Sequence, residues 1–352
     1  MRIAQIAPLY EAVPPKLYGG TERIVSHLTE TLVELGHDVT LFASADSRTR
    51  ARLAPMRGQA IRMDPDPLKS DVAAHLAMLH EVRRRSSEFD VLHFHVDLLQ
   101  FPLFAHIASK TLTTLHGRLD LADLGAAYSC WPSFPLVSIS DDQRRPLPSA
   151  NWLGTVHHGI PIDQYALSTQ PRGGYLAFLG RMSPEKRPDR AIAIAKAAGL
   201  PLRMAAKVDR ADAAYFRETI EPLLDDPAIE FIGEIRDADK TAFLGDAIAL
   251  LFPIDWPEPF GLVMIEALAC GTPVIAWNRG SVPEIIEDGV TGRVVETLEQ
   301  AVAAVGEVSS YDRTRIRERF EQRFSARTMA LNYEALYRCL HSLGSIETRL
   351  QA

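Results

Sequence analysis

Two acidic residues separated by seven others, Glu258 and Glu266, belong to the part of the sequence whose residue types best suit ligand chemistry. Residues 262–269 are apolar except for Glu266, so they predict a helix that is buried nearly all round. Glu266 is then a carboxylate inside a core, and it needs hydrogen-bond donors because burying it unpaired costs on the order of several kcal/mol. A ribose or sugar diol would supply two donors, and a structural arginine is the alternative partner.

The start of this helix predicts a binding site for an anionic group. We expect the helix to open near Phe260 and to end at Gly271, with Glu258 about one turn before its first residue. The amides of residues 261–263 have no partner within the helix, and the positive end of the helix dipole lies beside them. Amide donors and glutamate acceptors in one place suit a diphosphate with hydroxyl groups, which is what a nucleotide-sugar presents.

A second polar group of residues lies in the predicted loop between a strand that ends at Gly180 and a helix that begins at Pro188. This loop contains Arg181 and Lys186, and a diphosphate could bridge the two cations. A surface ion pair between Glu185 and either base is the alternative interpretation.

Residues 258–276 resemble the signature of family 4 retaining glycosyltransferases, which have the GT-B fold. The resemblance implies that Glu258 contacts hydroxyls of the donor sugar and that Glu266 holds the ribose hydroxyls. It implies that Arg181 and Lys186 bind the leaving diphosphate. Contacts to sugar and phosphate are implied for the amides of Phe260, Gly261, Leu262 and Val263.

The same resemblance gives roles to three other parts of the chain. His116 directly follows an apolar strand, and the family's histidine at such a strand end hydrogen-bonds the donor sugar; a structural histidine is the alternative. The loop with Gly19 and Gly20 resembles one that touches donor phosphate and acceptor, and a flexible turn is its alternative. The backbone of Ile235 corresponds to the position that reads the nucleobase. The predicted catalytic residues are therefore His116, Arg181, Lys186 and Glu258.

The elements that must position these residues alternate between strand and helix. In the first half we expect strands at 2–7, 36–43, 91–95, 111–115, 136–139 and 153–157, and helices at 21–35, capped by Thr21, 68–85 and 96–109. In the second half we expect strands at 175–180, 202–206, 229–232, 248–252 and from Pro273, and helices from Pro188 and at 211–224, 237–244, 298–308, 313–323 and 328–343.

This alternation predicts the α/β class, and 352 residues suit two domains. We expect an acceptor-binding Rossmann-like domain at 1–160, to which a C-terminal helix at about 328–352 returns. A nucleotide-sugar-binding Rossmann-like domain is expected at 161–327. With the resemblance, the expectation is a GT-B fold of two facing, doubly wound domains with a cleft between them.

Composition narrows the class of protein. The formal charge of -7 argues against nucleic-acid binding, and the three cysteines indicate neither a disulfide framework nor a zinc site. No run of 18 apolar residues occurs, and the first residues lead directly into a strand, so we expect a cytoplasmic protein. We expect neither a metal ion nor another cofactor.

A basic stretch in the first half allows two interpretations. Arginines recur at positions 48, 50, 52, 57 and 62, and three more stand at 83–85. A solvated face is the favoured interpretation. An anionic acceptor or a contact with a membrane surface is the alternative.

These observations predict a retaining, metal-independent hexosyltransferase that uses a nucleotide-sugar, with UDP-glucose preferred over GDP-mannose. The acceptor is expected to be a small soluble molecule or a glycan, bound by Tyr18, Arg118, Asp120 and Tyr128. A GT-B epimerase, a phosphorylase and a non-catalytic nucleotide-sugar sensor are the alternatives. They would respectively need no acceptor, require inorganic phosphate, or bind the donor without turnover.

Overall fold

The computed structural model describes residues 1–16 and 19–350 of the chain. The chain divides into two compact units. Unit 1 comprises Met1–Gly159 and Ala326–Ala352, and unit 2 comprises Ile160–Ser325. The expected boundaries, after residues 160 and 327, lie one and two residues from these divisions.

Unit 1 is built on a parallel sheet with the strand order β3-β2-β1-β4-β5-β6-β7. Its strands are short and mostly buried, as is usual where helices cover both faces of a parallel sheet. They are β1 (Arg2–Ile6), β2 (Asp38–Ala43), β3 (Arg52–Pro55), β4 (Val91–Phe94), β5 (Thr111–Thr114), β6 (Leu136–Ser138) and β7 (Trp152–Thr155). Strand β3 lies within the basic stretch and was not expected from the sequence.

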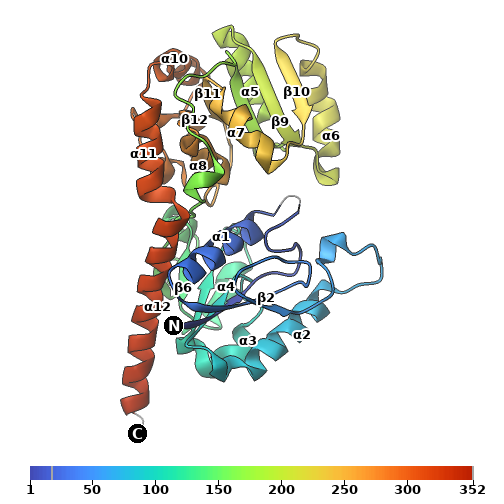
Figure 1. Cartoon of the computed structure of the whole chain (residues 1–352). Helices are drawn as coiled ribbons and strands as arrows, with labels where there is room; N and C mark the ends of the chain where they lie inside the picture. The colour runs from blue at the N-terminus through green and yellow to red at the C-terminus, as the bar shows by residue number, and fades with distance from the viewer. Residues whose placement is uncertain (17–18, 351–352) are drawn as a thin grey trace. The chain divides into compact units, whose positions relative to one another are not determined.

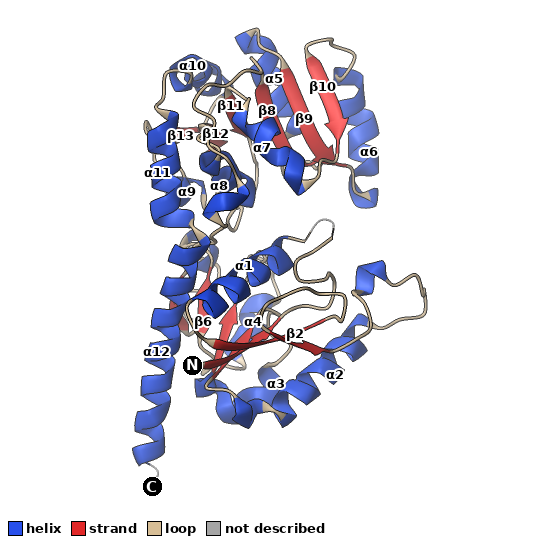
Figure 2. Ribbon diagram, in the orientation of Figure 1, coloured by secondary structure: helices blue, strands red, loops and turns tan. Residues whose placement is uncertain are grey.

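Helices lie on both faces of this sheet (Figure 2). They are α1 (Gly20–Glu34), α2 (Asp71–Arg84), α3 (Phe101–Phe104), α4 (Leu124–Ser129) and α12 (Ala326–Leu350). The long helix α12 lies beside α1 (Figure 1). It also contacts β4, so the end of the chain belongs to unit 1.

Two helix expectations in unit 1 are wrong. Gly19, not Thr21, is the N-cap of α1, and a glycine has no side chain with which to cap the helix. The helix expected at 96–109 is only the short α3 followed by a 3₁₀ helix, Ala105–Lys110. Asp97 has a left-handed backbone with φ +54°, and Ile107 is not helical, so a continuous helix is interrupted at both places.

Unit 2 has a second parallel sheet with the order β10-β9-β8-β11-β12-β13. Its strands are β8 (Leu176–Arg181), β9 (Leu202–Lys207), β10 (Ile229–Gly233), β11 (Ala249–Phe252), β12 (Val274–Trp277) and β13 (Gly292–Val295). Its helices are α5 (Pro188–Ala198), α6 (Ala213–Tyr215), α7 (Asp237–Gly245), α8 (Leu262–Ala269), α9 (Val282–Ile285), α10 (Leu298–Val308) and α11 (Arg313–Phe324).

The helix expected at 211–224 is also wrong, because this segment is broken. It comprises a 3₁₀ turn, the short α6, a π-helical turn over Phe216–Ile220 and another 3₁₀ turn over Glu221–Leu223. Pro222 lies in the last turn and has no amide hydrogen, so a regular α-helical hydrogen-bond ladder cannot continue through it.

The strand orders locate the crevice in each sheet where a ligand binds in doubly wound folds. The order reverses between β1 and β4 in unit 1, and between β8 and β11 in unit 2. Ligands of such sheets bind beyond the carboxyl ends of the strands at this reversal. In unit 2 these ends lead into residues 182–187 and 253–261, which contain the motifs singled out above. None of the helices in the described part of the chain combines the length and the apolar character that a membrane span requires.

Candidate functional site

The two loops beside the strand reversal of unit 2 meet through Lys186 and Glu258. The Lys186 ammonium forms an ion pair with a carboxylate oxygen of Glu258, and the two side chains are only 15% and 11% exposed. The indole Nε1 of Trp256 donates to the same glutamate oxygen at 3.0 Å. The loops are also joined by backbone, since the Asp255 amide donates to the Glu185 carbonyl at 2.9 Å. A cation and an acid from the two predicted motifs therefore share one place.

Aromatic rings and a strained turn hold Lys186. Its ammonium lies 5.5 Å from the ring centroid of Phe252 and 5.4 Å from that of Trp256, which are favourable cation–π distances. The next residue, Arg187, has a left-handed backbone at φ +51° and is the N-cap of α5, and Pro188 fills the first turn of that helix. The turn therefore ends the loop abruptly and keeps Lys186 beside the strand ends.

The backbone around Glu258 is held by residues that follow β12. The Ser281 amide donates to the Glu258 carbonyl at 3.0 Å, and the Ser281 hydroxyl donates to the Phe260 carbonyl at 2.8 Å. Gly280, with φ +55°, packs so closely that an added Cβ would lie 2.4 Å from the Glu258 nitrogen. The sequence indicated only a turn here, because nothing in it shows which loop this turn contacts.

Helix α8 begins at Leu262, two residues later than expected, after Gly261 in a left-handed conformation at φ +82°. Gly261 has no side chain to cap the first turn, so the amides of Leu262 and Val263 remain available to a ligand. At the other end Gly271 is left-handed as predicted, with φ +77°. Arg317 of α11 donates to the Ala269 carbonyl at 2.5 Å, which places a cation at the negative end of the dipole.

Glu266 is buried on α8, and its two oxygens differ. Lys240 of α7 donates to Oε1 at 2.9 Å and is itself 3.2 Å from Asp237. The second oxygen, Oε2, is buried and has no hydrogen-bond partner among the described residues. The cation is thus a lysine and not the arginine considered above, and one acceptor remains for a ligand hydroxyl. Sequence reasoning missed Lys240, although a buried acid beside a helix that contains a single lysine was a usable signal.

Arg181 at the end of β8 is shared among carboxylates. Its guanidinium lies 3.4 Å from Glu185, 3.7 Å from Asp212 and 4.0 Å from Asp209. The ion pair with Glu185 that was weighed against diphosphate binding is therefore present for Arg181. For Lys186 the partner is Glu258 instead. A diphosphate would have to replace carboxylates at both cations.

The remaining predicted donor positions lie in a loop or at the start of a helix. Ile235 is half-buried in the loop between β10 and α7, the helix that supplies Lys240. Gly20 opens α1, and Gly19 has protein close by: an added Cβ would lie 2.9 Å from Pro15 and 3.2 Å from Glu11. Contacts within the protein therefore already require glycine at position 19.

In unit 1, His116 follows β5 and is joined to other histidines. Its Nε2 lies 2.9 Å from Nδ1 of His95, and its ring stacks on His158 with centroids 5.2 Å apart. Burial lowers the pKa of His116 to about 3, so the imidazole is neutral near pH 7. Its Nδ1 is buried without a hydrogen-bond partner among the described residues.

Two family profiles match the chain. The profile Glycosyltransferase Family 4 matches residues 18–152, and the profile Glycosyl transferases group 1 matches residues 166–323. The chain is a family 4, group 1 glycosyltransferase. The first match lies in unit 1 and the second in unit 2, so each unit of the glycosyltransferase is matched by one of the two family profiles.

Relatives of this glycosyltransferase differ in their activities. Phosphatidyl-myo-inositol mannosyltransferase of Mycobacterium leprae is 26% identical over 359 residues, covering 91% of this chain and 90% of the relative. Glycogen synthase of Mycobacterium tuberculosis is 29% identical over 361 residues, covering 87% and 86%. Among solved structures, Anabaena HepE in complex with UDP-glucose matches with a TM-score of 0.70 at 18% identity, covering 97% of this chain and 100% of that one. The two parallel sheets and this likeness show the GT-B fold.

The predicted acceptor residues of the glycosyltransferase do not gather in one place. Arg118 and Asp120 form an ion pair at 2.7 Å just after His116. Tyr128 is only 6% exposed and packs against Phe101 in the core of unit 1. Tyr18 lies outside the described residues.

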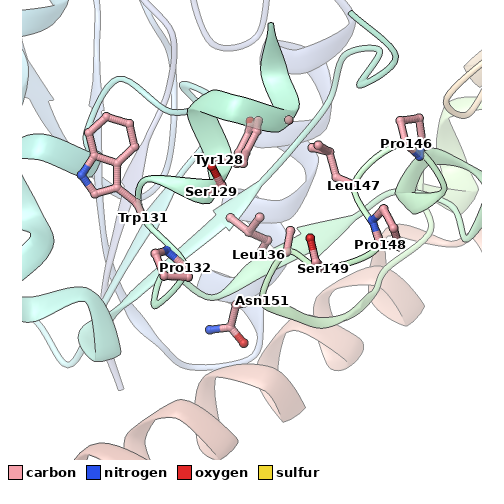
Figure 3. A pocket seen from close by; sticks show the side chains of 12 residues that line it. Tyr128, Ser129, Trp131, Pro132, Leu136, Pro146, Leu147, Pro148, Ser149 and Asn151 are labelled. Carbon is pink, nitrogen blue, oxygen red and sulfur yellow. The ribbon is translucent and has the colours of Figure 1, made fainter. Parts of the chain in front are cut away.

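Tyr128 lines a small pocket of about 110 Å³ together with Trp131 and prolines (Figure 3). The pocket also contacts Leu136 and Asn151, which stand at the amino-terminal ends of β6 and β7. Ligands of this fold class bind at the opposite strand ends, where His116 lies. We therefore retain Arg118 and Asp120 as candidates for acceptor binding in place of Tyr128, and Tyr18 stays a prediction.

The basic stretch of the glycosyltransferase is largely paired. Arg50 binds Glu30 and Glu34, and other ion pairs join Arg57 to Asp64, Arg62 to Glu11, Arg84 to Glu81 and Arg85 to Glu88. Such pairing supports the solvated-face interpretation over an anionic partner. Over the described residues, no group of three His, Cys, Asp or Glu side chains could hold a metal ion.

Proposed function

We propose that the protein transfers a hexose from a nucleotide-sugar to an acceptor hydroxyl, with retention of configuration and without a metal ion. The observation that carries this proposal is the meeting of Lys186, Glu258 and the uncapped start of α8 at the strand reversal of unit 2. Charged donors, an acid acceptor and free amides stand there together, and this is the chemistry that a sugar diphosphate requires.

The chemical difficulty of the reaction is the departure of a diphosphate from the anomeric carbon. Negative charge grows on the leaving oxygen, and Arg181, Lys186 and the α8 amides would stabilise it. The bond from the anomeric carbon to the phosphate oxygen breaks, and a bond to the acceptor oxygen forms on the same face. The departing phosphate oxygen takes the proton of the acceptor hydroxyl. Glu258 would bind sugar hydroxyls and not act as a nucleophile.

For the nucleoside, Glu266 offers one buried oxygen without a partner to a ribose hydroxyl, while Lys240 holds the other oxygen. For the donor we favour UDP-glucose over GDP-mannose, because a related fold has been solved with UDP-glucose. The mannosyltransferase relative is the reason to keep GDP-mannose as the second candidate. Calorimetric titration with both nucleotide-sugars separates them, and tighter binding of GDP-mannose would reverse the preference.

The anomeric outcome tests the reaction itself. We expect proton NMR of the fresh product, or of the hexose released slowly to water, to show the configuration of the donor. Activity should persist in excess EDTA, and loss of activity that added Mg²⁺ or Mn²⁺ restores would overturn the metal-independent mechanism. An inverted product would remove the retaining assignment. Conversion of UDP-glucose to another nucleotide-sugar without an acceptor would favour the epimerase instead.

We further propose that the protein acts in the cytoplasm. Cys130, Cys270 and Cys339 are all free thiols, which supports a reducing compartment. Fractionation of cells that express the full chain tests this location, and its recovery from an oxidising compartment would contradict it.

A further inference from the structure

A continuous chain of hydrogen bonds runs through the core of unit 1 and ends at His116. Tyr337 of α12 lies 2.7 Å from Nδ1 of His93 and 3.1 Å from the amide nitrogen of Gln5 on β1. The amide oxygen of Gln5 lies 2.8 Å from Nε2 of His95, whose Nδ1 is 2.9 Å from Nε2 of His116. Gln5, His93 and Tyr337 are fully buried, and His95 is 3% exposed. Water therefore does not compete for these bonds, and each donor or acceptor must find its hydrogen-bond partner in the neighbouring side chain.

The direction of every bond between Gln5 and His116 follows from the orientation of the Gln5 amide. Its oxygen can only accept, so His95 must donate from Nε2. His95 is neutral because burial lowers its pKa well below the ordinary value, so its Nδ1 carries a lone pair and accepts from Nε2–H of His116. Because His116 is neutral too, its Nδ1 bears no hydrogen and is an acceptor.

The other arm of the chain agrees with this orientation. The Gln5 amide nitrogen donates to the Tyr337 hydroxyl, and that hydroxyl donates to Nδ1 of His93. Nε2–H of His93 then donates to Thr114 at 2.8 Å, and the hydroxyl of Thr114 is hydrogen-bonded to that of Tyr333 at 2.9 Å. Reversing the Gln5 amide would reverse all these bonds and make Nδ1 of His116 a donor. The tautomer of His116 is thus set by residues on β1 and α12.

We propose that Gln5 and Tyr337 are positioning residues that, through His95, hold His116 in the Nε2–H tautomer and so present its Nδ1 as a hydrogen-bond acceptor to a hydroxyl of the transferred sugar. The unpartnered, buried Nδ1 is the observation that points to a ligand. The identity of that ligand rests on the proposed function, whereas the tautomer does not.

The tautomer can be measured without any reaction. In the full-length protein labelled with ¹⁵N-histidine, long-range proton–nitrogen correlation spectra should show His116 protonated on Nε2 only, with the signals assigned by their loss in His116→Gln. A hydrogen on Nδ1 in the wild-type protein would overturn the proposal. This result stands whether or not the protein transfers sugar.

Two tyrosines on the same helix provide a matched pair of variants. Tyr337→Phe removes the nearer acceptor of the Gln5 amide nitrogen, at 3.1 Å, and leaves only Nδ1 of His93 at 3.4 Å. The orientation of the Gln5 amide is then held more weakly, so His116 should lose its single tautomer. Tyr333→Phe removes an equally buried hydroxyl, at the far end of the series of hydrogen bonds, and should leave the tautomer of His116 unchanged. Equal effects of the two changes on the His116 signals would show a merely structural role and overturn the proposal.

Mono-deoxy analogues of UDP-glucose test the ligand. With the wild-type enzyme, removal of the one hydroxyl that binds His116 should lower kcat/KM by roughly tenfold or more, as expected for a lost hydrogen bond to a buried group. In Tyr337→Phe this discrimination should shrink, and in Tyr333→Phe it should persist. Discrimination that is equal in all three proteins would refute the assigned ligand. Absence of transfer from every donor, with the tautomer as stated, would refute the proposed function instead.

Discussion

Lys186 and Glu258 neutralise each other at the end of β8 and β11, and this pairing has a consequence for ligand binding. A diphosphate carries more negative charge than one carboxylate, so we expect it to take over the ammonium and release the glutamate oxygen for sugar hydroxyls. Arg181 is surrounded by three carboxylates, so a diphosphate that binds this second cation must also displace carboxylate oxygens from it. Binding of the donor diphosphate and release of the Glu258 oxygen from Lys186 then occur in one step.

Lys186→Ala tests this role. We expect turnover to fall by about 2 to 4 kcal/mol of transition-state stabilisation, because one preorganised charge at the leaving group is lost. The measurement is kcat with the preferred nucleotide-sugar. Lys196→Ala is the control, since Lys196 also pairs with a carboxylate, at 2.9 Å from Asp226, but lies on α5 away from the loop. A normal kcat in Lys186→Ala, or an equal loss in both variants, would contradict the assignment.

Glu266→Gln tests the nucleoside contact at the same scale. Lys240 keeps Asp237 as a partner in this variant, so the change is gentler than removal of the lysine, which would leave a buried acid unpaired. We expect affinity for UDP to weaken by about 1.5 to 3 kcal/mol, the usual worth of a hydrogen bond to a charged group. Isothermal titration calorimetry measures this affinity, on protein that has first been shown to unfold cooperatively on heating. Equal UDP affinity in the variant and the wild type would rule out the ribose role.

At the scale of elements, the turn after β12 determines where Glu258 stands. Ser281 binds the backbone on both sides of Pro259, and Gly280 fits against Glu258 only because it has no side chain. This turn is therefore part of the site although none of its residues was predicted to bind a ligand.

Gly280→Ala should displace the Glu258 loop. Its Cβ would lie 2.4 Å from backbone atoms of Glu258, so we expect lower activity and a loss of stability beyond the roughly 1 to 2 kcal/mol of left-handed strain. Gly289→Ala is the control, because Gly289 has φ +76° and nothing within 4 Å of an added Cβ. Activity and urea denaturation of the two variants give the comparison. If Gly280→Ala resembles Gly289→Ala in both, the turn does not position Glu258.

The sequence was sufficient for elements whose signals are local. Helix α10 was expected at 298–308 and observed there, because Thr297 caps it and its apolar residues recur at helical spacing. The segments at 96–109 and 211–224 failed, because the periodic pattern gave too little weight to Asp97, which takes an unusual backbone conformation, and to Pro222. Local pattern therefore found the order of strands and helices but not every interruption.

The residues of the candidate site were likewise predictable only where their signal is local in the sequence. Arg181, Lys186, Glu258 and Glu266 were found because they stand in two contiguous motifs. Lys240, Gly280 and the Gln5–His95 bond could not be found, because each depends on which distant segments the fold brings together. A single sequence carries no signal for such pairings beyond the need of a buried charge for a partner.

At the scale of the molecule, unit 1 holds a cluster of four histidine rings in neutral form. Burial lowers the pKa of His93, His95, His116 and His158, whereas in the unfolded chain a histidine titrates near 6.5. Between the folded and unfolded pKa values the unfolded chain binds more protons, so the free energy of unfolding falls as pH falls below about 6.5. Above that pH both states are neutral and the effect vanishes. Glu22 and Asp97, with pKa raised by burial, act in the opposite direction.

His93→Gln isolates this contribution from that of the acids. Each buried neutral histidine should remove about 1.4 kcal/mol of stability between pH 7.5 and pH 5.5, so the variant should lose about that much less than the wild type over the same interval. Urea denaturation gives the free energy of unfolding of each protein at the two pH values. When the change with pH in the variant is subtracted from that in the wild type, the contributions of Glu22 and Asp97 cancel. His80→Gln is the control, because His80 is exposed on α2 and should leave the pH dependence unchanged. If both variants keep the wild-type pH dependence, His93 is not held neutral by the fold, and the donor and acceptor roles assigned to His93 between Tyr337 and Thr114 would lose their physical support.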